Sequence, residues 1–233
     1  MPDAFSRSEL LLGPTALSIL QDSRLAIFGL GGVGSFAAEA LARSGIGSFI
    51  LVDKDMVSLT NLNRQLVALH STIGLPKVQV MRERMLDINP AAEIVAIQEF
   101  YDAQNASSIL TGNLSYVVDA IDTISSKIDL IVRCRERGIP IISAMGAGNK
   151  LDPERLEIAD LAVTSVCPLA RVMRTELRKR GIHNVPVVYS REEPLKTENR
   201  ERGRSPGSVP FVPSVAGLLL ASRVVKDLVL KQL

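Results

Sequence analysis

A glycine-rich turn between an apolar strand and a helix constrains the fold of this chain more than any other feature. Residues 24–29 are mostly apolar, and glycines follow at Gly31 and Gly34, with an additional one at Gly32. With Gly29 they give the G-x-G-x-x-G spacing, in which glycine permits a tight turn, close approach of backbone N–H groups to phosphate, and helix–strand packing. The start of the helix adds free amides and a positive dipole end. The pattern predicts a nucleotide at this turn.

An acidic residue stands at the end of the next predicted strand. Asp53 closes the apolar run 48–52, roughly 20 residues after the glycines, where a carboxylate can accept hydrogen bonds from ribose hydroxyls. The glycine spacing by itself fits NAD, FAD, S-adenosylmethionine or ATP, so other residues must discriminate among these ligands.

Strand and helix patterns alternate through the first two thirds of the chain. We expect strands at 24–29, 48–52, 93–98, 116–121 and 140–144. We expect helices at 32–44, 77–88, 105–110 and 126–137. This rhythm predicts an α/β fold with a Rossmann-like, mostly parallel sheet and right-handed crossovers.

The pattern loosens after residue 148. Residues 156–162 alternate like an edge strand, and a proline in 185–190 indicates a second edge strand. We expect a basic helix at 168–180, a mobile polar loop at 192–207 and a closing helix at 215–230. We interpret residues 1–233 as a single domain, with a nucleotide-binding half (about 1–148) and a substrate or crossover half (about 149–233).

The composition points to a cytoplasmic protein. No apolar leader follows Met1, and the longest uncharged stretch, near 209–222, is short and broken by proline, so neither a signal peptide nor a membrane span is predicted. The two cysteines form no C-x-x-C pair, so neither a disulfide framework nor a structural zinc site is indicated.

The segment after Asp53 favours ATP over a dinucleotide. A triphosphate needs cations, and Arg64 can clamp phosphate oxygens with two hydrogen bonds. Lys77 opens the next predicted helix and can place an ammonium on the β- and γ-phosphates, and Asn61 can orient ribose or phosphate. The alternative interpretation of Arg64 and Lys77 is that they are exposed cations at helix ends.

Two carboxylates follow the strand at 116–121. The carboxyl ends of parallel strands are where open α/β sheets bind ligands, and a carboxylate beside phosphates holds Mg²⁺. Asp122 lies nearer the strand tip than Asp119, so we predict that Asp122 is the Mg²⁺ ligand. Asp119 points to the other side and is expected to cap or brace a neighbouring loop.

Taken together, these motifs resemble the E1-like (ThiF/MoeB/HesA) adenylating superfamily, in order and in spacing. They are Gly29-x-Gly-Gly-x-Gly34, Asp53-x-Asp55, Thr60-Asn-Leu-Asn-Arg-Gln65, Gly74-x-Pro-Lys77 and Asp119-x-x-Asp122. The resemblance implies an E1-like fold that adenylates a carboxylate with ATP and Mg²⁺. It implies nucleotide contacts from the glycines, Asp53, Asp55, Asn61, Arg64, Gln65 and Lys77, with the cation at Asp122.

The resemblance also implies a homodimer with composite sites. In this superfamily an arginine near the N-terminus reaches the ATP of the partner subunit, and Arg7 matches it here. Arg7, Arg64, Lys77 and Asp122 are therefore the expected catalytic set.

Further motifs resemble one branch of the superfamily, which dehydrates N6-threonylcarbamoyladenosine at position 37 of tRNA. They are Ala40–Gly47, Ile88-Asn-Pro90, Cys134–Pro140, Gly146-Ala-Gly148, Asp160-Leu-Ala162, Pro168–Arg171 and Val212–Gly217. This similarity implies a cyclisation through an adenylated carboxylate. The alternative is an adenylyltransferase for a ubiquitin-like sulfur-carrier protein, against which the lack of zinc C-x-x-C pairs weighs. A sulfur-relay protein is a further candidate partner.

Two other classes of function fit less well. A nicotinamide oxidoreductase does not need Arg64 or Lys77, and a non-catalytic nucleotide-binding scaffold does not need these cations together with Asp122.

The charge distribution fits an anionic substrate. Residues 171–204 hold ten basic and five acidic side chains, although the whole chain has a net charge of only +2. The candidate tRNA contacts are Arg171, Arg174 and Arg178, which share one helical face, and Arg200, Arg202 and Arg204 in the polar loop. Only 4% of residues are aromatic, so contacts to the RNA backbone and shape are expected rather than base stacking.

The two cysteines are expected to be structural. Cys134 falls inside a predicted helix. Cys167 precedes the basic helix, where nearby cations would favour a thiolate, but the inferred dehydration does not require an acyl-accepting thiol.

Overall fold

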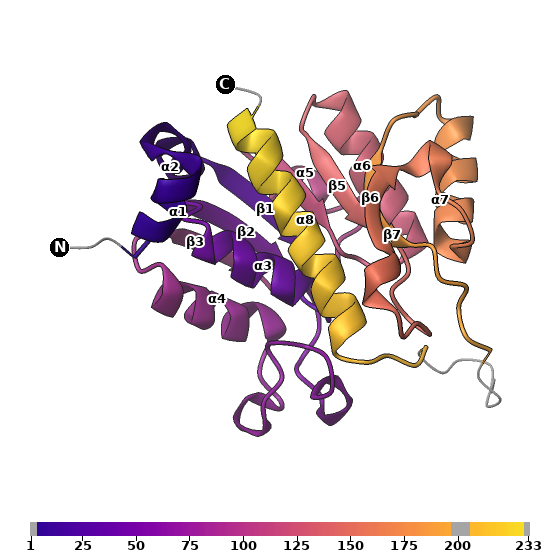
Figure 1. Ribbon diagram of the computed structural model, residues 1–233, viewed down its shortest axis with the longest axis horizontal. Coiled ribbons are helices and arrows are strands. Elements are labelled where there is room, and N and C mark those ends of the chain that lie inside the picture. The colour runs from indigo at the N-terminus through magenta and orange to yellow at the C-terminus, as the bar shows by residue number, and fades with distance from the viewer. Residues whose placement is uncertain (1–3, 197–205, 231–233) are drawn as a thin grey trace.

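The computed structural model describes residues 4–196 and 206–230, which form a seven-stranded sheet covered by helices on both faces (Figure 1). The strands, in the spatial order β3-β2-β1-β4-β5-β7-β6, are β1 (Arg24–Phe28), β2 (Ser48–Val52), β3 (Glu93–Ile97), β4 (Tyr116–Asp119), β5 (Ile141–Ala144), β6 (Leu156–Asp160) and β7 (Pro186–Ser190). All neighbouring strands pair in parallel except β6 with β7. The mostly parallel α/β sheet predicted from the sequence is therefore confirmed.

The helices occupy both layers. They are α1 (Ser6–Leu12), α2 (Pro14–Gln21), α3 (Gly34–Arg43), α4 (Lys77–Ile88), α5 (Ala106–Ile109), α6 (Ile124–Glu136), α7 (Pro168–Lys179) and α8 (Phe211–Leu230). Short 3-10 turns span Leu59–Asn61, His70–Thr72, Pro153–Arg155 and Leu161–Val163. Within the described part of the chain, none of these helices combines the length and the apolar character needed to cross a bilayer.

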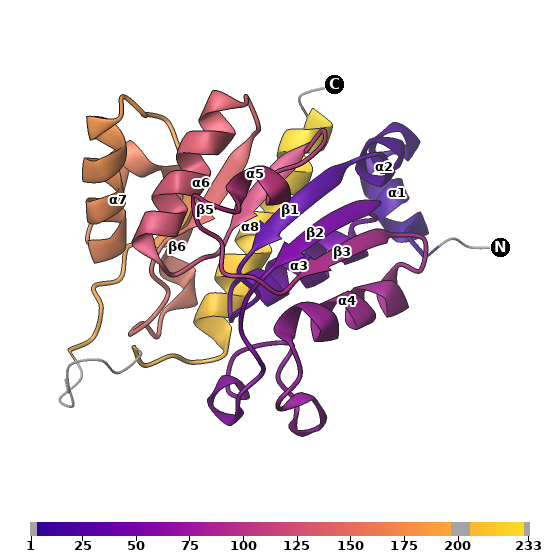
Figure 2. The same cartoon turned by 180° about the vertical axis from the view of Figure 1, so that it is seen from behind.

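Each face of the sheet has its own apolar core. Along β1, Leu25 and Ile27 pack into a cluster with α2, α3, α4 and α8, whereas Ala26 and Phe28 pack into a second cluster with α5, α6 and α7. This division follows from the alternation of side chains along a strand. The two layers are seen from opposite sides in Figures 1 and 2.

The closing helix α8 lies against α3 and the glycine turn. A Cβ atom placed on Gly217 would come within 2.3 Å of the carbonyl oxygen of Val33, so glycine is what allows the two helices to approach so closely. The helix begins at Phe211, earlier than the predicted residue 215, because Pro213 falls in the first turn, where a missing N–H breaks no helical hydrogen bond.

The predicted edge position of the strand at 185–190 is wrong. The strand lies inside the sheet, where Val187 and Val188 pair with β5 on one side and with β6 on the other. Proline is compatible with this position because Pro186 is the first residue of the strand. β6, at the end of the sheet, is the edge strand in this part of the chain.

The N-terminal helices α1 and α2 have no counterpart in the sequence prediction. Both are short, and α1 contains no buried residue, so neither shows the long amphipathic pattern on which a prediction depends. Of the predicted mobile loop at 192–207, residues 197–205 lie outside the described residues.

Candidate active site

The ends of β1, β2 and β4 open into a cavity of about 380 Å³ at the carboxyl edge of the sheet. β1 lies between β2 and β4, so the chain reverses its direction of travel across the sheet here, which is where open α/β sheets bind ligands. Ten of the predicted site residues line the cavity: Gly29, Gly31, Gly32, Asp53, Asp55, Asn61, Arg64, Gln65, Lys77 and Asp122. The structure therefore brings together residues from five separate segments.

The glycine turn is sterically required. Gly29 has φ +86°, and a Cβ atom there would lie 2.6 Å from the carbonyl oxygen of Ala120. A Cβ atom on Gly34 would lie 1.8 Å from the carbonyl oxygen of Gly29, so Gly34 allows β1 and α3 to pack closely and does not itself line the cavity. No side chain caps the N-terminus of α3, which leaves amide groups there for an anion.

Asp53 is held by two backbone amides. Its Oδ2 accepts a hydrogen bond from Leu30 N at 2.6 Å, and its Oδ1 accepts one from Asp55 N at 2.8 Å. Burial raises the pKa of this carboxyl above its usual value, although both hydrogen bonds and Lys77 oppose the shift. Each oxygen retains a lone pair, so the carboxyl can also accept a hydroxyl of a bound ribose.

Lys77 and Asp55 form an ion pair on the cavity wall. The ammonium Nζ lies 3.0 Å from Asp55 Oδ2, and the Lys77 side chain is only 5% exposed, whereas that of Asp55 is 51% exposed. Lys77 N also donates to Asp55 O. The Lys77 ammonium is thus fixed in position beside the glycine turn, paired with an Asp55 carboxylate that faces solvent.

Arg64 lines the cavity and keeps donors without a partner among the described residues. Its Nη1 donates to Thr60 O and to Asn63 Oδ1, both at 3.0 Å, which uses one of its three nitrogens. Asn61 is buried, and its Oδ1 accepts from Ser58 N at 3.1 Å to close the turn that carries Arg64. Asn61 therefore shapes this segment as well as lining the cavity.

Gln65 presents a buried acceptor without a partner. Its Oε1 has no hydrogen bond to any described residue, and the side chain lines the cavity while only 8% of the residue is exposed. An unsatisfied buried carbonyl costs about 1–3 kcal/mol. A ligand hydroxyl or amine would satisfy this atom, so Gln65 fits a nucleotide in the cavity.

The two carboxylates after β4 have different environments. Asp119 is fully buried and ion-paired with Lys127 at 2.9 Å, as expected for a bracing residue. Asp122 is exposed at the cavity rim, and Thr123 Oγ1, at 3.3 Å from its Oδ1, is its one side-chain hydrogen-bond donor among the described residues. Asp122 is therefore available to a cation. No three His, Cys, Asp or Glu side chains among the described residues form a metal cluster.

Sequence reasoning missed several cavity residues, among them Lys54, Phe100 and Tyr101. Lys54 Nζ lies 5.0 Å from the centre of the Phe100 ring. Tyr101 donates to Asp129 Oδ2 at 2.9 Å, and burial together with this carboxylate raises the pKa of its hydroxyl. These residues follow β2 and β3, so the strand-end rule that selected Asp53 and Asp122 was the available signal.

The other predicted residues that the structure describes do not line the cavity. Arg7 is exposed on α1 and does not line it. Arg200, Arg202 and Arg204 lie outside the described residues.

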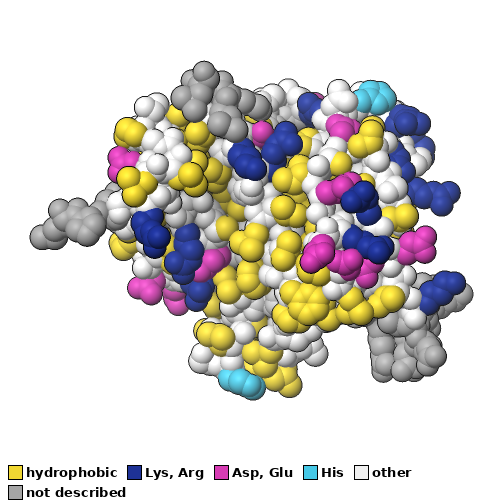
Figure 3. All heavy atoms as spheres, viewed as in Figure 1, with side chains coloured by type: hydrophobic (Ala, Val, Ile, Leu, Met, Phe, Trp, Pro, Cys, Tyr) yellow, Lys and Arg dark blue, Asp and Glu magenta, His cyan; other side chains and the backbone are white. Residues whose placement is uncertain are grey.

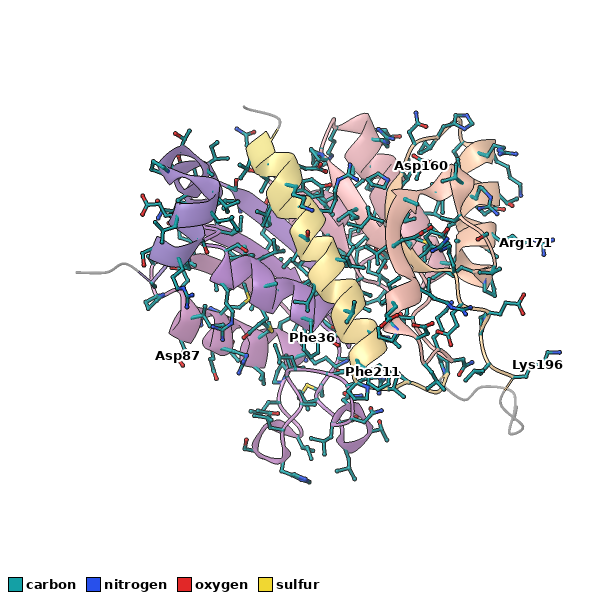
Figure 4. All side chains as sticks on the ribbon, viewed as in Figure 1. Phe36, Asp87, Asp160, Arg171, Lys196 and Phe211 are labelled. Atoms are coloured by element: carbon teal, nitrogen blue, oxygen red, sulfur yellow. The ribbon has the colours of Figure 1, made fainter. Side chains whose placement is uncertain are left out.

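The arginines of α7 form a separate surface. Arg171 and Arg178 are exposed, and Figure 4 shows Arg171 projecting outward from α7. In Figure 3, Lys and Arg side chains stand along this edge of the molecule with acidic side chains between them. Arg174 differs, because its Nη1 donates to Leu161 O, Thr164 O and Thr164 Oγ1 and thereby holds the preceding turn.

Both cysteines are buried, as expected for structural residues. Burial raises the pKa of the Cys134 thiol to about 12. Cys167 is 3% exposed and occupies the N-cap position of α7.

Comparison with known proteins agrees with this geometry. The ThiF family model matches residues 5–232. The tRNA threonylcarbamoyladenosine dehydratase of Bacillus subtilis is 49% identical over 238 residues, which cover 96% of this chain and 94% of that protein.

Solved structures of the Escherichia coli tRNA N6-threonylcarbamoyladenosine dehydratase are also similar. The complex with AMP has a TM-score of 0.92 at 35% identity and the complex with ATP has a TM-score of 0.91 at 36% identity, each covering 98% of this chain and 95% of that one. The match spans both halves of the molecule, and the chain belongs to the ThiF family.

Proposed function

We propose that this protein uses ATP to dehydrate N6-threonylcarbamoyladenosine in tRNA. The observation that carries the proposal is the convergence of a glycine turn, Asp53, Arg64, Lys77 and Asp122 on one cavity at the strand ends. The names of its relatives favour this reaction over activation of a sulfur-carrier protein. We therefore assign the cavity to ATP.

In this assignment each set of polar groups contacts a different part of the nucleotide. Asp53 and Gln65 accept hydrogen bonds from the nucleoside, because both offer acceptors to the cavity. The glycine turn and the start of α3 receive the phosphates. Arg64 and Lys77 neutralise the phosphate oxygens, and Lys77 exchanges part of its interaction with Asp55 for the nucleotide.

Asp122 would hold Mg²⁺, which supplies positive charge to the phosphates when bound. Asp122 suits this role because it is exposed at the rim of the cavity and has few internal hydrogen bonds.

The chemistry follows from activation of a poor electrophile. An oxygen of the threonyl carboxylate attacks the α-phosphorus of ATP and pyrophosphate leaves, which converts the carboxylate into an acyl adenylate. The neighbouring carbamoyl group then attacks the acyl carbon, AMP leaves, and one proton is lost as the ring closes. Ring closure is intramolecular, so proximity lowers its barrier without an enzyme nucleophile. The buried thiols of Cys134 and Cys167 are consistent with this route.

The tRNA is proposed to lie against the basic edge of the molecule. Arg171 and Arg178 are exposed on α7 and have no side-chain hydrogen bond or ion pair to another described residue, in contrast to Arg174. We propose that they contact RNA phosphates together with Arg200, Arg202 and Arg204. This division leaves nucleotide binding to residues 1–148 and substrate binding to residues 149–233.

We further propose a homodimer in which Arg7 of one subunit completes the site of the other. Its exposure on α1, away from its own cavity, supports this role. A sulfur-relay protein stays a candidate partner, and the cytoplasm is the proposed location because tRNA is the substrate.

The decisive experiment supplies the purified protein with ATP, Mg²⁺ and tRNA carrying the modified nucleoside. We expect AMP release together with a nucleoside that has lost the mass of one water. AMP release that requires a diglycine-tailed carrier protein instead, with an unchanged nucleoside, would replace this proposal with the sulfur-carrier alternative.

A further inference from the structure

A buried ion pair lies behind the cavity wall formed by the loop after β4. Asp119, the last residue of β4, and Lys127, in the second turn of α6, are both 0% exposed and are joined at 2.9 Å. Ser143 Oγ on β5 donates to Asp119 Oδ2 at 2.6 Å. Neither charge reaches the cavity, so neither can touch the nucleotide.

The pair holds one residue of the loop, Ile121, through both of its backbone polar groups. Asp119 Oδ1 accepts a hydrogen bond from Ile121 N at 3.1 Å, and Lys127 Nζ donates to Ile121 O at 3.0 Å. Both backbone groups of Ile121 are thus fixed by side chains from the elements that flank the loop. We call this arrangement the Ile121 clasp.

The clasp controls residues that line the cavity. The loop 120–123 connects β4 to α6, and all four of its residues contribute to the cavity wall. Ala120 is anchored by its own N–H bond to Phe28 O at 2.8 Å, but Asp122 has no backbone bond to a neighbouring strand among the described residues. The position of Asp122 therefore depends on Ile121, the residue immediately before it.

Stability alone does not explain two buried charges at this place. Replacing a buried ion pair with apolar side chains of similar volume is often neutral or stabilising, because the desolvation cost disappears. An ion pair that also satisfies both backbone groups of a loop residue provides something that apolar side chains cannot, which is a defined loop conformation.

We infer that Asp119 and Lys127 are positioning residues that present the Asp122 carboxylate to the nucleotide-bound cation. This inference rests on the proposed role of Asp122. It predicts that loss of the clasp weakens the response to Mg²⁺ even when the fold is retained.

Two double variants separate the hydrogen bonds of the clasp from its charges. Asp119→Leu with Lys127→Met removes both charges and both bonds to Ile121. Asp119→Asn with Lys127→Gln removes the charges and keeps one acceptor and one donor for Ile121. Ser143→Ala is the matched control, because it removes a hydrogen bond to Asp119 and leaves the clasp intact.

The measurement is ATP affinity as a function of Mg²⁺ concentration by calorimetry, with thermal unfolding in parallel. We expect the Leu/Met variant to need roughly tenfold or more Mg²⁺, the size of effect seen when residues behind a metal ligand are changed. We expect the Asn/Gln variant and Ser143→Ala to respond to Mg²⁺ like the parent protein. A Leu/Met variant with the parent response, or an equal shift in Ser143→Ala, would overturn the inference.

If the Leu/Met variant does not fold, hydrogen exchange of the unaltered protein tests whether the clasp is present. The Ile121 amide is expected to exchange as slowly as that of Val118 in β4, and exchange at the rate of an open loop would overturn the clasp. Failure of the proposed function is distinguishable, because it would appear as intact ATP and Mg²⁺ binding without dehydration of tRNA.

Discussion

At the scale of single residues, burial decides which of two cavity lysines is suited to act on phosphate. Lys77 is held against Asp55 with almost no exposure, so its ammonium has one position. Lys54 lies over the Phe100 ring but is exposed, so its ammonium can adopt many other positions in water. A fixed charge stabilises a transition state more than a mobile one, because it needs no reorganisation.

Lys77→Met is therefore expected to lower kcat for AMP formation by about 10²- to 10³-fold, the usual loss for one preorganised group. The melting temperature should change little, because the Asp55 carboxylate left behind is half exposed. The measurement is AMP release at saturating ATP. Lys54→Met is the control and should retain most of the rate; equal losses in both variants would contradict the distinction.

Two glycines of the turn have different roles. A Cβ atom on Gly34 meets backbone at 1.8 Å, whereas one on Gly31 meets nothing closer than Gln65 Nε2 at 3.8 Å. Gly34→Ala is expected to destabilise the protein by about 1–3 kcal/mol, the cost of overpacking. Gly31→Ala should leave the free energy of unfolding nearly unchanged and weaken ATP binding, because its methyl group enters the cavity.

Denaturant unfolding and ATP titration of both variants test this division. A stable Gly34→Ala protein with normal ATP affinity would show that the turn has another way to accommodate a side chain.

At the scale of elements, α3 and α4 are joined by Glu39. Its carboxylate accepts from Arg84 Nε at 2.7 Å on α4 and from Arg43 Nε at 2.8 Å on its own helix. Burial opposes ionisation, but the two arginines outweigh it and lower the pKa of Glu39. A lowered pKa means that the folded state favours the charged form, so this contribution exists above the unfolded pKa and is lost as pH falls through the folded one.

Glu39→Gln is consequently expected to lower the free energy of unfolding by about 0.5–1 kcal/mol at pH 7. The deficit is small because both arginines are partly exposed and screened by water. The deficit should shrink as pH falls below 4.5, the ordinary value for Glu, and vanish below the folded pKa. Unfolding of both proteins by urea between pH 7 and pH 3 tests this. A deficit that is independent of pH would mean that packing rather than charge is lost.

At the scale of the whole molecule, the end of the chain completes the nucleotide turn near its beginning. A Cβ atom on Gly32 would lie 3.2 Å from Pro213 in the first turn of α8, and one on Gly217 would meet Val33 O at 2.3 Å. α8 is also the helix with the most extensive packing on α3. The helix at the C-terminal end thereby fixes the turn that begins after β1.

Gly217→Ala should therefore lower stability by about 1–3 kcal/mol through overpacking and should weaken ATP binding at the same time. Leu218→Ala is the neighbouring control, because that side chain is 48% exposed and its loss should change neither property. Melting temperature and ATP affinity are the measurements. Lower stability with unchanged ATP affinity would show that α8 does not influence the turn.

The sequence determined those features of this protein that depend on local pattern. The glycine spacing, the apolar strands and the acidic strand ends predicted a mostly parallel sheet and placed Asp53 and Asp122 at its carboxyl edge. These predictions succeeded because strand ends in a parallel sheet converge wherever the chain crosses it. The family resemblance rested on the same residues.

Only the tertiary structure decided the features that depend on burial and on contacts between distant segments. In the folded chain β7 lies inside the sheet in spite of Pro186, and Arg174 hydrogen-bonds to the turn before α7. The charges of Asp119 and Lys127 are buried. A sequence pattern gives the type of a side chain, but its pKa, its partners and its exposure follow from what packs around it. For that reason ten of the residues that line the cavity could be predicted from the sequence, and the Ile121 clasp behind them could not.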